Sequence, residues 1–191
     1  MRERIILGIS GASGVVYGIE ILKELAKRDI ETHLIISESG KKNIIIETDY
    51  SIKDVESIAD HVYGDKEFEA PPASGSFLTG GMIVAPCTIK TLSGIANSYS
   101  DNLLVRAADV TLKEKRKLVL MVRETPLHRG HLNLMRRAAD LGAHILPPMP
   151  SFYNHPRTIE DIIHQTIGKV FDYFGIEHHL FRRWGNDREA N

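Results

Sequence analysis

The sequence lacks the features that mark secreted, membrane and nucleic-acid-binding proteins. Cys87 is the only cysteine among 191 residues, which excludes an intramolecular disulfide. The chain carries 24 Lys and Arg against 25 Asp and Glu, and a net charge of -1 offers no electrostatic basis for binding nucleic acid. No apolar run approaches the roughly 20 residues of a membrane-spanning helix. We therefore expect a soluble, cytoplasmic protein that binds neither nucleic acid nor a membrane.

Two further absences concern targeting and metals. Residues 2–4 are charged and precede only a few apolar residues, which is not the pattern of a secretory signal peptide. The nine histidines include two close pairs, His128/His131 and His178/His179. Neither pair has the spacing of an HExxH or Cys/His ligand set. The sequence therefore predicts no metal cofactor.

Apolar runs alternate with helical patterns along the chain. Runs typical of buried parallel strands occupy residues 5–9, 31–37, 82–86, 118–122 and 143–146. Helices are expected between and after them, including one or two within residues 40–66 whose core positions are Ile44, Ile45, Ile46, Ile52, Val55 and Ile58. Strands that alternate with helices predict an α/β fold, with a doubly wound parallel sheet in three layers and a single domain over residues 1–191.

The first apolar run leads into a turn of small residues, GISGASG at residues 8–14. Backbone N–H groups at the start of the following helix, with the Ser10 and Ser13 hydroxyls, would face an anion. The glycines at 8, 11 and 14 do not fit G-x-G-x-x-G, so the turn favours a mononucleotide over a dinucleotide. A tight turn that binds nothing is the structural alternative.

Three further polar groups follow predicted strands. Ser37 is suited either to a ligand hydrogen bond or to capping the next helix. The segment from Thr88 to Thr91 repeats the strand-to-helix arrangement of the first turn, and Arg123 and Glu124 follow the strand at 118–122. The carboxyl ends of parallel strands share one edge of a sheet. Four groups at that edge indicate a nucleotide with a flat heterocycle, and FMN fits better than NAD.

Two other segments are interpreted from composition alone. Residues 70–76, APPASGS, are too rich in Pro, Gly and Ser for a helix or strand, and form either a spacer or a contact with a ligand or subunit. Cys87 has no Cys-His signature around it, and we expect a small core residue rather than a nucleophile.

Six segments in this order resemble the UbiX-type flavin prenyltransferases of the UbiX/Pad family. They are GISGASG, ISES, APPASGS, PCTIKTLSGIA, RAADVTLKEKRKLVLMVRETPL and LPPMPSFY, and together they extend over nearly the whole chain. The family consists of FMN-binding flavoproteins, so the resemblance implies a Rossmann-like, flavodoxin-like version of the doubly wound fold. It also implies FMN as the bound flavin, with no metal required.

The resemblance implies an activity. Members transfer a dimethylallyl group from dimethylallyl phosphate to N5 and C6 of reduced FMN. The product, prenylated FMN, is the cofactor of UbiD-type decarboxylases in ubiquinone biosynthesis and aromatic acid decarboxylation, and members were formerly described as polyprenyl-hydroxybenzoate or phenylacrylic acid decarboxylases. A homo-oligomer is implied, of which a dodecamer is one form. The C-terminal helix and tail, about residues 158–191, would then lie in subunit contacts.

The resemblance also assigns residues to roles. FMN would be held by Gly11, Ala12, Ser13, Ser37, Thr88, Ile89, Lys90, Thr91 and Arg123. The prenyl phosphate would be bound by Arg106, Lys113, Tyr153 and Lys169, some of them from a neighbouring subunit. Glu124 with Glu47 in support would transfer protons, and Ser13 would either assist the chemistry or only bind FMN. Some relatives carry arginine at the position of Lys169. Lysine keeps the positive charge there but lacks the bidentate fork of a guanidinium.

Two other functions are compatible with the residues. An FMN-dependent decarboxylase or oxidoreductase of the same fold would turn over without a prenyl donor. A non-catalytic flavin carrier would keep all its measurable properties after substitution of Glu124. The residues also leave open whether the donor is a monophosphate or a diphosphate.

Overall fold

The computed structural model describes residues 2–185, and residues 186–191 of the expected C-terminal tail lie outside the described residues. The chain divides into two compact units, Met1–Pro147 and Pro148–Asn191. Within the part of the chain that the structure describes, no helix combines the length and the apolar character needed to cross a membrane.

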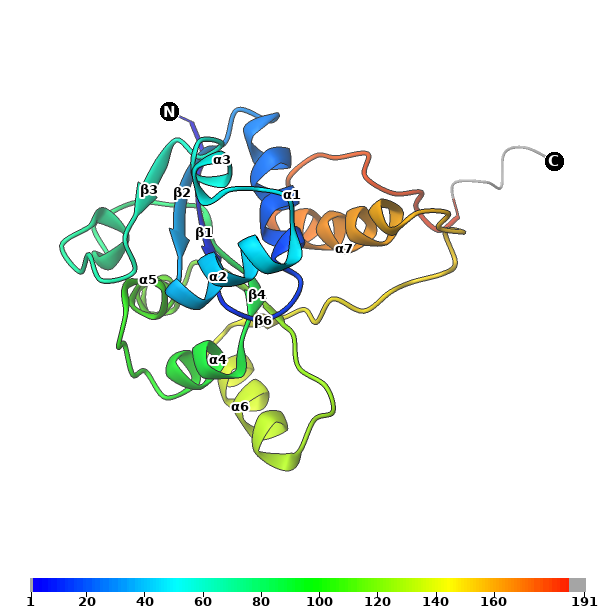
Figure 1. Cartoon of the computed structure of the whole chain (residues 1–191). Coiled ribbons are helices and arrows are strands. Elements are labelled where there is room, and N and C mark those ends of the chain that lie inside the picture. The colour runs from blue at the N-terminus through cyan, green and yellow to red at the C-terminus, as the bar shows by residue number, and fades with distance from the viewer. Residues whose placement is uncertain (1, 186–191) are drawn as a thin grey trace. The chain divides into compact units, whose positions relative to one another are not determined.

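The first unit is built on a six-stranded sheet (Figure 1). The strands are β1 (Arg4–Ile9), β2 (Glu31–Ile36), β3 (His61–Tyr63), β4 (Gly81–Cys87), β5 (Lys117–Val122) and β6 (His144–Ile145). Their order is β3-β2-β1-β4-β5-β6 and all neighbours are parallel. Strands β2 and β3 therefore lie on one side of β1, and β4 to β6 lie on the other side. This reversal of strand order between β1 and β4 is typical of doubly wound folds. The predicted fold class is confirmed.

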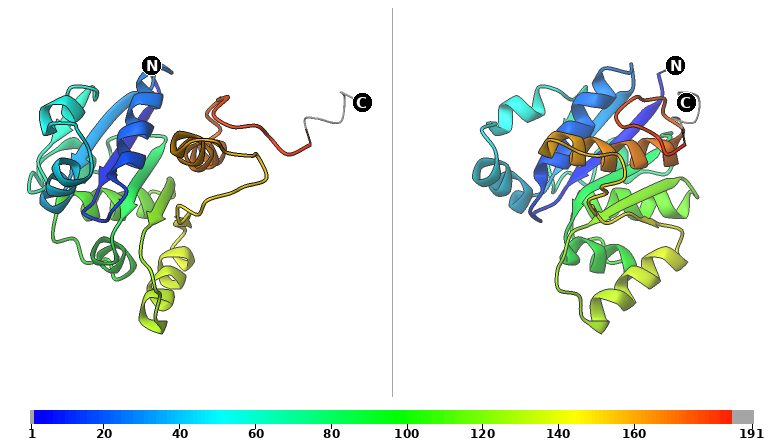
Figure 2. Two further views of the ribbon diagram at one scale, coloured as in Figure 1. Left: turned by 45° about the vertical axis from the view of Figure 1, so that its right-hand side comes forward. Right: turned by 90° about the vertical axis from the view of Figure 1, so that its right-hand side faces the viewer.

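Helices cover both faces of this sheet (Figures 1 and 2). They are α1 (Val15–Ala26), α2 (Glu38–Glu47), α3 (Ile52–Glu56), α4 (Ile89–Ala96), α5 (Leu103–Lys113) and α6 (Arg129–Asp140), with a 3-10 turn η1 at Pro71–Ala73. One face packs on α1, which also contacts α2. On the other face, side chains of alternate strand positions such as Ile6, Met82 and Leu120 form a buried cluster with α4 and α5. Two covered faces explain why the central strands are apolar throughout.

The prediction for residues 40–66 was partly wrong. This segment contains the strand β3 as well as α2 and α3. Ile44 and Val55 are buried as expected, but Ile45 and Ile46 are 65% and 77% exposed. Successive helical residues point about 100° apart, because a turn has about 3.6 residues. Of the three consecutive isoleucines, only Ile44 therefore points into the core.

The second unit contains one long helix, α7 (Ile159–Phe174). The Thr158 side chain and Asp161 form a reciprocal capping box at its start, and Gly175 ends it with a φ of 78°. Asp172 accepts hydrogen bonds from Arg183 at 2.7 Å and from His178 at 3.1 Å. The bond from Arg183 lowers the pKa of Asp172. These contacts hold the segment that follows α7 against its last turn.

A glycine sets the distance between α1 and the sheet. A Cβ atom placed on Gly18 would lie 2.3 Å from the Ala85 carbonyl oxygen in β4 and 2.9 Å from Cγ1 of Ile9 in β1. Neither the strand backbone nor a buried core side chain can yield that space cheaply. Gly18 therefore allows α1 to approach the two central strands closely.

We expect Gly18→Ala to lower the free energy of unfolding by about 1–3 kcal/mol, because the added methyl group overpacks a buried contact. The measurement is urea unfolding of the full chain. Gly94→Ala in α4 is the matched control, since its Cβ would meet only side-chain atoms and one carbonyl at 3.1–3.2 Å. Equal stability of the two variants would contradict this account of Gly18.

Candidate active site

Ser10 joins the carboxyl ends of β1 and β4. Its side chain is 1% exposed, and its hydroxyl donates to the Pro86 carbonyl at 2.7 Å and accepts from the Thr88 N–H at 2.9 Å. The expectation that the Ser10 hydroxyl faces an anion was therefore wrong, because both of these hydrogen bonds are internal. The bridge fixes the two strand-to-helix turns beside each other at the switch point of the sheet, where ligands bind in open α/β folds.

The start of α1 is occupied by the carboxylate of Glu47. Glu47 ends α2, and its Oε2 accepts hydrogen bonds from the N–H of Gly14 at 2.7 Å and of Val15 at 3.3 Å. A carboxylate at a helix N-terminus is favoured by the helix dipole. The structure thus brings Glu47 to the turn that contains Ser13, whose side chain is exposed.

The turn before α1 lies directly on the start of α2. A Cβ atom on Gly11 would lie 2.3 Å from the side chain of Ser39, and the Gly11 carbonyl accepts a hydrogen bond from the Asn43 amide at 3.0 Å. No side chain fits at residue 11 without displacing α2. Gly11 and Ala12 therefore present the backbone, rather than side chains, at the carboxyl edge of the sheet.

The other predicted hydroxyl residues begin helices. Ser37 caps α2 by accepting from the Gly40 N–H at 3.1 Å, and Thr88 caps α4 by accepting from the Thr91 N–H at 3.0 Å. Capping is thus one role of Ser37, as the sequence allowed. The Thr88 hydroxyl also donates to the Thr91 hydroxyl at 3.0 Å, which orients both side chains.

Ser37, Thr88, Lys90 and Thr91 line one cavity of about 190 Å³. The structure therefore brings together residues from two of the predicted turns. The cavity is completed by residues that sequence reasoning missed, among them Glu38, Ser39, Asp65, Lys66, Asp101, Asn102 and Val105.

Asp65 is the most informative of the missed residues. Its Oδ1 is buried without a hydrogen-bond partner, and its Oδ2 accepts from the Asn102 amide at 3.4 Å. Burial raises the pKa of the Asp65 carboxyl. Asp65 follows β3 by two residues, so it also lies at a strand carboxyl end. Asp65 could have been predicted if β3 had been recognised as a strand, but the sequence pattern did not reveal β3.

Arg123 and Glu124 directly follow β5, next to the end of β4. The Arg123 N–H donates to the Cys87 carbonyl at 3.1 Å, and both side chains are exposed. Glu124 accepts from the N–H of Thr125 at 3.1 Å. Cys87 itself is fully buried, and burial raises the pKa of its thiol. A buried thiol held in its neutral form is a core residue and not a nucleophile.

Arg106 and Lys113 lie two turns apart on one side of α5. The Arg106 guanidinium donates to the Ala73 carbonyl of η1 and pairs with Asp109, both at 3.2 Å. Lys113 is the last residue of α5 and pairs with Glu114. Seven helical residues span roughly 10 Å. Arg106 lies near the start of α5, which is the end nearer the switch-point edge, and Lys113 lies farther from it.

Tyr153 and Lys169 belong to the second unit. Residues 153–155 and 182–185 line a cavity of about 420 Å³ there, and the Tyr153 and Trp184 rings meet edge to face at 5.6 Å. The Lys169 ammonium lies 3.6 Å from Asp172 Oδ2. This unit therefore offers a phenol beside a cavity lined by two arginines, Arg182 and Arg183.

The donor set at the switch point fits a flavin mononucleotide. A flavin presents a phosphate, ribityl hydroxyls and a ring edge of alternating donors and acceptors. The cavity offers hydroxyls, the Lys90 ammonium and the Asp65 oxygen that has no internal partner. A buried polar group without a partner costs free energy unless a ligand satisfies it. The residues present therefore match the group in hydrogen-bonding capacity.

Comparisons with known proteins agree with this geometry. The family model named Flavoprotein matches residues 1–171. Flavin prenyltransferase UbiX from Thauera aromatica is 55% identical over 97% of this chain and 96% of its own length.

Two solved structures are similar over nearly all of the chain. AnUbiX (PadA1), whose crystal structure is in complex with FMN and dimethylallyl pyrophosphate, has a TM-score of 0.95 and 43% identity, and the match covers 96% of this chain and 98% of that one. The dodecameric FMN-dependent UbiX-like decarboxylase from Escherichia coli O157:H7 has a TM-score of 0.93 and 47% identity, with 95% and 98% covered. With its switch-point site and these similarities, the chain belongs to the UbiX family of flavin prenyltransferases.

Proposed function

We propose that this chain transfers a dimethylallyl group from dimethylallyl phosphate to reduced FMN. The observation that carries the proposal is the convergence of turn backbone, helix-capping hydroxyls and the Arg123–Glu124 pair at one edge of the sheet. Reduced FMN, when bound, supplies the electron-rich nitrogen and ring carbon that accept the prenyl group. The protein contributes binding, orientation and proton transfer.

The FMN site would use three groups of residues. Gly11, Ala12 and Ser13 would present the turn to the phosphate, since the first N–H groups of α1 are taken by Glu47. Ser37 and the segment from Thr88 to Thr91, with Ile89 and Lys90, would hydrogen-bond the polar parts of the flavin. Arg123 would add positive charge beside the end of β4.

The prenyl phosphate would be held by Arg106, Lys113, Tyr153 and Lys169. Breaking the allylic C–O bond leaves charge on the departing phosphate and on the carbon fragment. Cationic side chains and a phenol stabilise the phosphate as it leaves. Each of the three cations is paired with a carboxylate, which the phosphate would displace, and the proposal includes no metal ion.

Glu124 would accept the proton that ring carbon C6 loses when it bonds to the prenyl fragment already attached at N5, and the prenyl double bond would take up a proton in the same step. A carboxylate close to that carbon provides general-base catalysis. Glu47 would support it as a negative charge facing the allylic fragment, held in place by two backbone N–H groups. Ser13, one residue before Gly14, would then lie between the flavin and the leaving phosphate.

A second copy of the chain would complete the site. The cavity of about 190 Å³ is smaller than typical ligand pockets of roughly 300–1,000 Å³. Lys113 lies at the end of α5 away from the switch point, and Glu124 is exposed. We infer a homo-oligomer, with a dodecamer as its form and with residues 158–191 in subunit contacts. Both compact units would act as one flavin-binding domain.

The product would be prenylated FMN, delivered to a UbiD-type decarboxylase. We also propose that this reaction takes place in the cytoplasm.

Anaerobic incubation with reduced FMN and dimethylallyl phosphate tests the proposed function. We expect mass spectrometry of the extracted flavin to show a gain of one prenyl unit and release of inorganic phosphate. The diphosphate is tested in parallel as donor. Turnover of a carboxylic acid without any prenyl donor would point instead to a decarboxylase, and unmodified flavin under all conditions would point to a carrier.

Glu124→Gln should lower the rate of flavin prenylation by about 100-fold, because an amide cannot accept the ring proton. FMN binding, measured by fluorescence quenching, should change little. Glu3→Gln is the control, since Glu3 is an exposed glutamate just before β1, at the opposite edge of the sheet from the site. Full activity of Glu124→Gln would remove Glu124 from the mechanism.

Ser13→Ala should lower the prenylation rate by about tenfold, the effect of one lost hydrogen bond in the transition state. Its affinity for FMN should stay close to that of the wild type. Ser57→Ala, at the end of α3, provides the comparison because that hydroxyl bonds only locally to Asp54. An unchanged rate with weaker FMN binding would restrict Ser13 to binding the nucleotide.

A further inference from the structure

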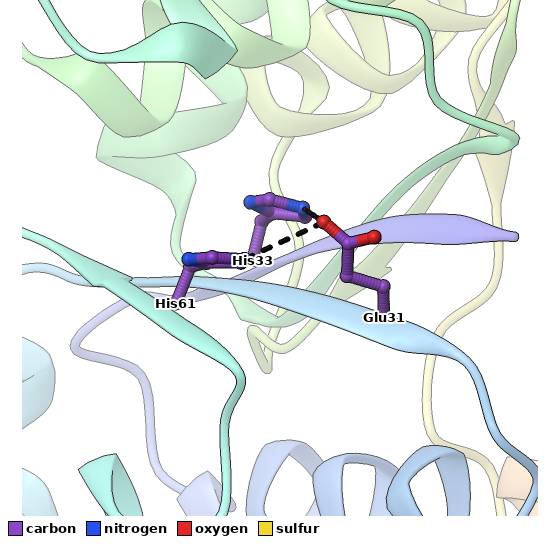
Figure 3. A group of neighbouring side chains, drawn as sticks. All are labelled: Glu31, His33 and His61. Carbon is purple, nitrogen blue, oxygen red and sulfur yellow. Dashed lines mark hydrogen bonds and ion pairs between the residues drawn. The ribbon is translucent and has the colours of Figure 1, made fainter. Parts of the chain in front are cut away.

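Glu31, His33 and His61 form a cluster at the amino-terminal ends of β2 and β3 (Figure 3). His33 and His61 are direct partners in the parallel register, and Glu31 lies two residues before His33 on the same face of β2. From His33 to Ser37 the strand runs about 13 Å. The cluster therefore lies toward the edge of the sheet opposite the flavin site.

Both imidazoles lie beside one oxygen of Glu31. Nε2 of His33 lies 3.1 Å from Glu31 Oε1, and Nε2 of His61 lies 3.4 Å from the same oxygen. The three candidate ligand atoms all lie within 4.8 Å of one another. Ligand atoms about 2.1 Å from a tetrahedral zinc are about 3.4 Å apart. The atoms thus have nearly the spacing of a bound divalent ion. The His33 and His61 rings are stacked at 13° with centroids 4.7 Å apart, so the half-exposed His61 ring would turn to bring its Nε2 lone pair onto the ion.

Neighbouring aromatic residues fix the His33 ring. Nδ1 of His33 lies 2.9 Å from the Tyr63 hydroxyl, and the Phe77 ring meets it edge to face at 4.8 Å. The second nitrogen of a metal-binding histidine is usually hydrogen-bonded in this way, which orients the ring and leaves Nε2 for the metal. The His33 side chain is 2% exposed, whereas that of His61 is 51% exposed. An ion could therefore enter from solvent on the His61 side and keep a water ligand there.

Arg4 is the one cation in contact with this group among the described residues. Its Nε donates to Glu31 Oε1 at 3.1 Å, and its guanidinium lies over the Phe77 ring at 5.1 Å. Arg4 therefore shares Oε1 with the two imidazoles, and because each carboxylate oxygen has two lone pairs, Oε1 can accept from Arg4 and still bind an ion. The arginine then acts as an outer partner of the ligand.

We propose that Glu31, His33 and His61 bind a divalent transition-metal ion that joins β2 to the short edge strand β3. Two imidazoles and one carboxylate are a ligand set that suits zinc and its neighbours rather than Mg²⁺ or Ca²⁺. The site is separate from prenyl transfer, and its role is to hold the three-residue edge strand on the sheet.

Zinc titration of the chelator-treated, FMN-loaded full chain tests this site. Calorimetry should give one Zn²⁺ per chain, and Zn²⁺ should raise the thermal unfolding temperature. His61→Ala and Glu31→Gln should each weaken binding by at least about tenfold. Because His61 is half exposed, its truncation leaves the fold intact, which a native unfolding temperature without metal would verify.

His179→Ala and His128→Ala are matched controls, the first the exposed member of the His178/His179 pair and the second a member of the His128/His131 pair, whose rings lie 3.5 Å apart at 32°. Both should bind Zn²⁺ as the wild type does. Absence of binding to the wild type, or unchanged affinity in His61→Ala, would overturn the proposal. Loss of binding in His128→Ala alone would assign the ion to the other pair and overturn it as well.

Discussion

The Ser10 bridge between β1 and β4 is the contact on which the site depends. A buried hydroxyl that donates to one turn and accepts from another contributes about 1 kcal/mol per hydrogen bond. The Ser10 bridge matters more for the geometry of the site than for stability, because it fixes the ends of β1 and β4 where the order of the strands reverses. The turns before α1 and α4 then lie side by side, and Ser37 and Thr88 line the cavity at this edge of the sheet.

Glu47 couples a second pair of elements at this edge. Its carboxylate ends α2 and caps the first N–H groups of α1, so the two helices are tied across the turn that contains Gly11. An anion that binds there meets the turn backbone and not the bare helix end. The same contact places a carboxylate beside the residue that follows Ser13, where the helix dipole favours its negative charge.

The two edges of the sheet carry different chemistry. Hydroxyl, amide and cationic groups gather at the carboxyl ends of the strands, where turns are short and helices begin. Two imidazoles and a carboxylate meet at the amino ends of β2 and β3, where parallel register pairs His33 with His61. Parallel pairing thus brings residues from different parts of the sequence together at both edges of the sheet. The length of the strands separates the polar groups at one edge from the histidine cluster at the other.

The sequence by itself determined the fold class, the turn at residues 8–14, the strand ends at Ser37, Thr88 and Arg123, and the family. Apolar periodicity and small residues at turns are local signals, so they can be recognised without knowing which distant residues are in contact. The tertiary structure decided what local patterns cannot encode. The internal bonds of Ser10, the exposure of Ile45 and the three-residue strand β3 each depend on partners far away in the chain. The positions of Asp65 and of the Glu31–His33–His61 cluster also depend on β3. Pairing of β3 with β2 brings His61 beside His33, and Asp65 follows the end of β3 by two residues.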